Sequence, residues 1–187
     1  MANKDAAFGL RAIGKVGQNR DAQGLSEYNI STNATAIYQN DPVQMTADGT
    51  IGVANSSANV LLGALNGIFY TDATTQKPTW SNHLAGSNTA TDIVGFVSDD
   101  PYERFEIQSN ATPAITDIGN CADISYVAGS SPNFISKVEL DDATLVVTTA
   151  QLKILGFTKD PDNNEVAANA NLVVIINEHF LKAGAGI

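Results

Sequence analysis

Cysteine, histidine and basic residues are all scarce in this chain. Cys121 is the only cysteine among 187 residues, so no intrachain disulfide can form, and we expect Cys121 to be a small core residue. His83 and His179 are the only histidines, and they lack the spacing of a zinc site. We expect His83 in a polar loop and His179 at the surface, at the end of the last strand. Ten Lys and Arg stand against 20 Asp and Glu, for a net charge of -10. Such an acidic protein repels phosphate, which disfavours nucleic acid and anionic membrane surfaces as partners.

Long hydrophobic runs and catalytic motifs are also missing. The N-terminus has no long apolar segment, so we predict no secretory signal, and no stretch approaches the roughly 18 apolar residues of a membrane helix. The chain contains neither a glycine-rich phosphate loop nor a nucleophile elbow. We therefore predict a protein that is not an enzyme and holds no cofactor or metal. A small hydrolase that uses Asp99, Asp100 or Glu103 stays open as an alternative, although adjacent acids on a strand face opposite ways.

One acidic cluster has part of the spacing of a calcium loop. Asp160, Asp162 and Asn164 stand at i, i+2 and i+4. Such a loop needs Gly at its sixth position and Glu at its twelfth, where this chain has Glu165 and Asn171. The spacing therefore gives calcium only weak support.

What the chain does contain is a series of short apolar runs separated by turn residues. We predict strands at 25–30, 35–38, 43–46, 50–54, 60–70 (as two strands or one bulged strand), 92–97, 103–108, 123–127, 134–140, 144–149, 153–158 and 172–177. Residues 112–122 are expected to form one helical turn, and 71–82 and 159–171 long loops. The turn residues Asp48-Gly49 predict a hairpin between 43–46 and 50–54. This spacing predicts an all-β fold, a compact antiparallel β-sandwich or barrel with an extended N-terminal arm and at most one short helix.

The first twenty residues differ in charge from the rest, with four basic residues and a single acid, Asp5. Glycines interrupt the segment, so a helix is not expected. We predict an extended arm at 1–24 that becomes ordered on a partner, followed by a single β-rich domain at 25–187. The alternative is a first strand of the fold with a frayed start. The predicted partner-binding residues are the apolar Phe8, Leu10 and Ile13 and the basic Arg11, Lys15 and Arg20.

Several strings along the chain resemble one protein family. They are MANKDAAFGLR at the start, NDPV at 40–43, NGIFYTD at 66–72, DDPYERFEIQ at 99–108, KILG at 153–156 and LVVIINEH at 172–179. Together they resemble the capsid decoration, or cement, proteins of tailed bacteriophages, including cyanophages. The resemblance implies a β-rich virion structural protein that is made in the host cytoplasm and binds the major capsid protein on the capsid exterior. It also implies a homotrimer that stabilises the shell.

Two other structural roles remain open. A phage tail, fibre or head-spike component would bind a glycan or receptor, for which Trp80, Tyr70 and Tyr102 are the candidate aromatic residues. For the decoration role, in contrast, deleting residues 1–20 is expected to abolish capsid binding and leave a folded body. A bacterial surface or pilus-like subunit is disfavoured, because no secretory signal is predicted.

Overall fold

The computed structural model describes residues 2–17, 24–161 and 163–182. The protein is nearly all β: of the described residues, 39% lie in strands or isolated β-bridges and 3% in helical turns, and the antiparallel sheets pack as a sandwich. This confirms the predicted all-β class. The helical elements within the described ranges are two 3-10 turns, Ile115–Asp117 and Asp142–Thr144. The first lies inside the predicted helical turn; the second, capped by the Asp141 side chain, was not predicted.

One sheet has five strands and is called the β8 sheet here. Its order is β1 (Arg11–Lys15), β8 (Glu103–Gln108), β13 (Asn171–Ile176), β12 (Leu152–Phe157) and β9 (Cys121–Ala122). Every neighbouring pair is antiparallel. A two-stranded ribbon of β10 (Ile124–Ser125) and β11 (Glu139–Leu140) accompanies this sheet. Strand β1 therefore lies at one edge of the β8 sheet, with a neighbour on one side.

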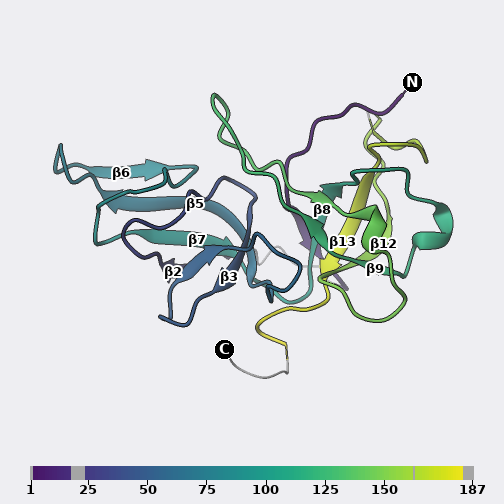
Figure 1. Ribbon diagram of the computed structural model, residues 1–187, viewed down its shortest axis with the longest axis horizontal. Helices are drawn as coiled ribbons and strands as arrows, with labels where there is room; N and C mark the ends of the chain where they lie inside the picture. The colour runs from purple at the N-terminus through teal and green to yellow at the C-terminus, as the bar shows by residue number, and fades with distance from the viewer. Residues whose placement is uncertain (1, 18–23, 162, 183–187) are drawn as a thin grey trace.

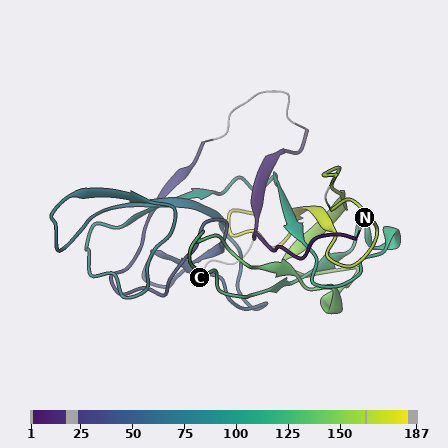
Figure 2. The same cartoon turned by 90° about the horizontal axis from the view of Figure 1, so that it is seen from above.

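The second sheet, the β5 sheet, has six strands. Its order is β2 (Ser26–Asn29), β7 (Val94–Ser98), β5 (Gly63–Thr71), β3 (Pro42–Met45) and β4 (Ile51–Val53), with β6 (Pro78–Ser81) also on β5. Figure 1 shows the two sheets beside one another along the long axis of the molecule. The edge strands β1 and β2, both purple, lie on the same side of the molecule in Figure 2.

Each sheet supplies one apolar cluster. Phe105 and Ile107 of β8 pack with residues of β12 and β13 in one cluster, and Leu65 and Ile68 of β5 belong to the other. Tyr126, at the base of the β10–β11 hairpin, packs against both clusters. The hairpin thus connects the two apolar clusters.

Several local predictions are confirmed. The turn at Asp48-Gly49 joins β3 to β4 in register, with Gly49 at a φ of 74°. Residues 60–70 contain the single bulged strand β5, whose register shifts between Leu65 and Gly67. Cys121 is buried, as expected of a core residue.

Four predicted segments are corrected. Residues 35–38 form no strand, since only Ile37 makes an isolated bridge there, with Leu84. Residues 71–82 are not all loop, because β6 pairs with β5 and places Trp80 opposite Phe69. Residues 144–149 form no strand, since only Val146 makes an isolated bridge and Val147 is 80% exposed. Of 134–140, only Glu139 and Leu140 are in a strand. In each case pairing with a distant segment, and not local β-propensity, decided the outcome.

Candidate interaction surface

The N-terminal segment lies along the body of the protein as an extended chain before it enters β1. The backbone N–H of Lys4 donates to Asn163 Oδ1 at 2.9 Å, and that of Ala6 to Gln108 Oε1 at 2.9 Å. Further along, the Leu10 N–H donates to the Asn40 carbonyl at 2.9 Å. The described part of the predicted arm is therefore held by the chain's own body.

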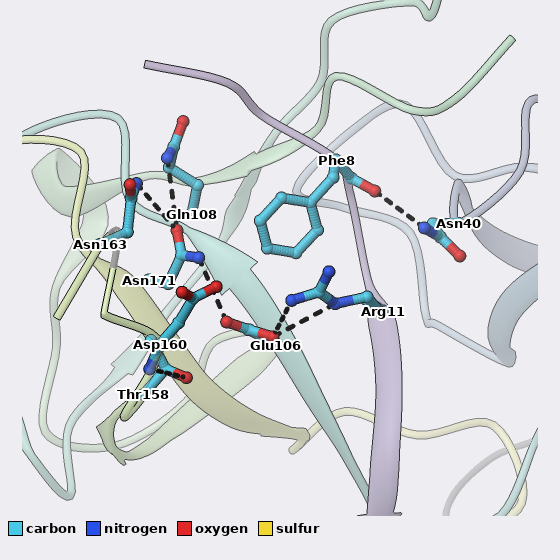
Figure 3. Close-up of polar contacts among 9 residues, drawn as sticks. All are labelled: Phe8, Arg11, Asn40, Glu106, Gln108, Thr158, Asp160, Asn163 and Asn171. Carbon is cyan, nitrogen blue, oxygen red and sulfur yellow. Dashed lines mark hydrogen bonds and ion pairs between the residues drawn. The ribbon is translucent and has the colours of Figure 1, made fainter. Parts of the chain in front are cut away.

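A buried polar network holds this segment in place (Figure 3). Gln108 ends β8 and Asn171 begins β13, and the two are register partners. Gln108 Nε2 donates to the Lys4 carbonyl at 2.9 Å, and Asn163 Nδ2 donates to the same oxygen at 2.8 Å. Asn171 Nδ2 donates to Glu106 Oε1 at 3.1 Å, which connects the network to β8. Buried amides of this kind are stable only when they are hydrogen-bonded, so the segment and the network depend on each other.

Gly9 allows the backbone of the N-terminal segment to pass in close contact with Asn40 and Ser136. Its φ is 75°, and a Cβ at this position would clash with the Asn40 carbonyl oxygen and the Ser136 side chain. Asn40 Nδ2 also donates to the Phe8 carbonyl at 3.1 Å. The next residue, Leu10, is then fully buried in the core cluster of the β8 sheet. Only glycine combines this backbone conformation with such a close approach.

Strand β1 contains a bulge that turns one apolar side chain outward. The register with β8 shifts between Ala12 and Gly14, so Ile13 is the extra residue. Gly14 has a φ of 146°. Ile13 is 43% exposed on this edge strand. Bulges on edge strands commonly redirect a side chain in this way.

The predicted partner-binding residues have different surroundings. Leu10 is corrected, because its side chain belongs to the chain's own core and is not free to anchor on a partner. Arg11 is ion-paired with Glu106, and its guanidinium lies 4.7 Å from the centroid of the Phe8 ring. Ile13 is exposed, and Arg20 lies outside the described residues.

Lys15 of β1 forms an ion pair with the turn that joins β7 to β8. Its Nζ lies 2.7 Å from Asp100 Oδ2. The hydrogen bond between the two raises the pKa of Lys15 and lowers that of Asp100. The neighbouring Asp99 accepts hydrogen bonds from the Ser26 hydroxyl at 2.9 Å and the Tyr28 hydroxyl at 2.6 Å. The acid pair considered above for a hydrolase is thus engaged in structural contacts.

A groove runs beside the N-terminal segment, and no sequence pattern predicted it. It consists of two adjoining hollows of about 420 and 320 Å³. Both are lined by Ala6, Ala7 and Lys137. The opposite wall is the loop between β10 and β11, which projects from the sheets in Figure 1.

His83 lies in a loop, as the sequence suggested, whereas His179 does not lie where it was expected. His179 was expected at the surface but is buried, which lowers its pKa to about 4. His83 was expected in a polar loop; its ring stacks on Phe134 at 3.9 Å between centroids, and burial lowers its pKa. Within the described ranges no group of three or more His, Cys, Asp or Glu side chains could hold a metal ion. Asp162 of the calcium-like spacing lies outside those ranges.

The outer face of the β5 sheet carries three aromatic side chains. Trp80 is 55% exposed, Phe69 is its register partner, and the Phe96 ring lies 5.0 Å from Trp80. Gly67 makes room for the indole, since a Cβ there would lie 2.6 Å from Trp80 Cζ2. Of the other aromatic candidates, Tyr102 is exposed while Tyr70 packs against the core.

No protein-family model, curated protein or solved structure matches this chain. Among the described residues no helix is long and apolar enough to cross a membrane. The structure is that of an all-β protein whose N-terminal segment is ordered and forms the edge strand β1.

Proposed function

We propose that this chain is a phage capsid decoration protein that binds the outer surface of the assembled major capsid protein shell, acting as a homotrimer. The observation that carries the proposal is Ile13, an exposed apolar side chain at the bulge of the edge strand β1. An edge strand offers backbone donors and acceptors to a partner, and an exposed aliphatic side chain beside them adds apolar contact area.

Two properties of the whole chain support the same proposal. Its net charge of -10 suits the outside of a capsid better than a lumen filled with DNA. The strings at the N-terminus and along the strands resemble those of decoration proteins. A protein that binds only the assembled lattice stabilises it by its binding free energy, and a trimer adds avidity.

The test is co-sedimentation with undecorated heads of the phage that encodes the protein. The wild-type chain should saturate the heads at a simple fraction of the shell subunits. Ile13→Asp should bind at least tenfold more weakly, because it places a charge in the apolar contact. Val147→Asp is the matched control, since it makes the same charge change at a more exposed position and should bind normally. Failure of the folded wild-type protein to sediment with heads would refute the proposal.

A tail, fibre or spike component with an adhesion role is a second candidate, favoured by the exposed Trp80 and its neighbours Phe69 and Phe96. Flat aromatic side chains stack on sugar rings. Trp80 is the only tryptophan, so its fluorescence reports directly on ligand binding at this face. Glycan-array binding that Trp80→Ala abolishes, without binding to heads, would favour this candidate.

A further inference from the structure

The groove beside the N-terminal segment has one wall of unpaired backbone. The described residues engage the N–H groups of Lys4, Ala6 and Leu10 and the carbonyl of Phe8. By contrast, no described residue hydrogen-bonds to the backbone of Asp5 or Ala7. In an extended chain the polar groups of alternate residues point to opposite sides. The backbone N–H and carbonyl groups of Asp5 and Ala7 therefore point away from the body, as on the open edge of a sheet.

The groove lies along this open edge. Asp5, Ala6 and Ala7 line its smaller hollow together with Val127 and Glu139, and Ala7 also lines the larger one. The small alanine side chains leave space above the backbone, and Val127 is an exposed apolar residue on the facing wall. Four extended residues span about 13 Å. An added strand of about this length could pair with residues 5–8 and place alternate side chains in the hollows.

The charges of the groove select the occupant. Asp5 and Glu139 both line the smaller hollow, and Lys137 is the basic residue there. The pKa of Glu139 is raised, first by burial and then by the negative charge of Asp5. No described residue forms an ion pair with either carboxylate. A Lys or Arg side chain would relieve this repulsion, whereas an acidic peptide or a phosphate would increase it.

We propose that the groove between residues 5–8 and the β10–β11 loop binds an extended, basic segment of a partner protein as an added β-strand. The open backbone of Asp5 and Ala7 would pair with the added strand, and the carboxylates of Asp5 and Glu139, which line the same hollow, would attract its basic side chain. This binding mode is independent of whether the partner is a capsid subunit.

The first measurement is amide hydrogen exchange of the free, full-length protein by NMR. The amides of Asp5 and Ala7 should exchange at least tenfold faster than those of Lys4 and Ala6, which are bonded to the body. Equal protection of all four amides would overturn the proposal, because the open edge would not exist.

The second measurement is a titration with blocked heptapeptides. The strand-forming peptide TVTKTVT should shift the Asp5 and Ala7 amides saturably and slow their exchange, and TVTETVT should bind at least tenfold more weakly. Asp5→Lys with Glu139→Lys should reverse this preference. Asp48→Lys with Glu27→Lys makes the same change in charge at two exposed positions elsewhere and should leave the preference unchanged. No saturable shift with the Lys peptide, or equal binding by the groove variant, would overturn the proposal.

Discussion

Asp41 and His179 provide a quantitative test of how the buried interior responds to pH. Asp41 is fully buried; its Oδ2 accepts a hydrogen bond from the Tyr38 N–H at 2.8 Å, while its Oδ1 has no partner among the described residues. Burial raises the pKa of Asp41 from 3.8 to about 6. His179 is buried with its Nε2 unpartnered, and burial lowers its pKa from 6.5 to about 4.

The two shifts have opposite effects on stability. Since the folded protein holds the proton of Asp41 more tightly than the unfolded chain, Asp41 adds stability as the pH falls from about 6 toward 3.8. His179 resists protonation when folded, so it removes stability as the pH falls from 6.5 toward about 4. Each tenfold change in proton affinity is worth about 1.4 kcal/mol, so each contribution amounts to about 3 kcal/mol. In the wild-type protein the two contributions nearly cancel.

Asp41→Asn removes the contribution of Asp41 and leaves that of His179. The free energy of unfolding of the variant, relative to wild type, should fall by about 2–3 kcal/mol between pH 7 and pH 4, because Asn cannot take up the proton by which Asp41 stabilises the folded state as the pH falls. The assay is urea unfolding followed by circular dichroism at pH 4, 5, 6 and 7. Subtraction of the wild-type curve cancels the contributions of all other groups.

Asp48→Asn is the matched control, since Asp48 is exposed in the β3–β4 turn. It should change stability by a constant amount at every pH. A constant difference for Asp41→Asn as well would refute the reasoning, because it would mean that the carboxylate of Asp41 keeps its ordinary pKa despite its burial.

Three further predictions concern the N-terminal segment and the sheets. Leu10→Ala should lower the free energy of unfolding by about 2–5 kcal/mol in urea titrations, because it empties a core position; a loss below about 1 kcal/mol would contradict the assigned burial. Gly63→Ala should prevent or strongly weaken folding, since its Cβ would clash with the Ser98 carbonyl, whereas Gly24→Ala has open space and should be tolerated in the same assay. Gln108→Leu should lower the free energy of unfolding by about 1–3 kcal/mol for each buried polar group that it leaves without a partner, and should speed hydrogen exchange of the Ala6 amide. Unchanged exchange of this amide would show that Gln108 does not hold the N-terminal segment.

The parts of the fold that the sequence predicted are those set by local patterns. The hairpin at Asp48-Gly49 needs only a turn and two flanking apolar runs. The strands β8, β12 and β13 lie close to their predicted ranges because apolar residues recur in each over five or six positions. The bulge in β5 was signalled by glycine within an apolar run.

The parts that escaped prediction depend on distant partners. Strand β6 begins at Pro78 in a polar stretch, and only its pairing with β5 makes it a strand. Residues 144–149 have high β-propensity, yet no neighbouring strand pairs with them beyond the single bridge at Val146. The order of strands in both sheets joins segments far apart in the chain, which periodicity does not reveal.

A partner-binding site in the N-terminal segment was predicted from the charge and glycine content of that segment, and it stays a prediction. Within the segment, Leu10 and Ile13 looked equivalent in the sequence. In the structure their side chains point in different directions. The bulge of β1 turns Ile13 outward, whereas Leu10, which follows Gly9, is buried in the core. The burial of Glu106 and His179 was equally hidden, because the groups that surround them are far away in sequence.

The ordered state of the N-terminal segment changes what partner binding requires. An arm that folds on a partner loses conformational entropy at that moment, which weakens binding. Here the described part of the segment is already fixed by Leu10 and the Gln108 network, so the edge at Ile13 and the groove at Asp5 and Ala7 would meet a partner at a smaller entropic cost. The same anchoring means that truncation is a poor test of binding, contrary to the expectation from the sequence. Deleting residues 1–20 removes Leu10 from the core and a strand from the β8 sheet, so lost binding would report lost folding. Surface substitutions that leave the anchors intact separate the two effects.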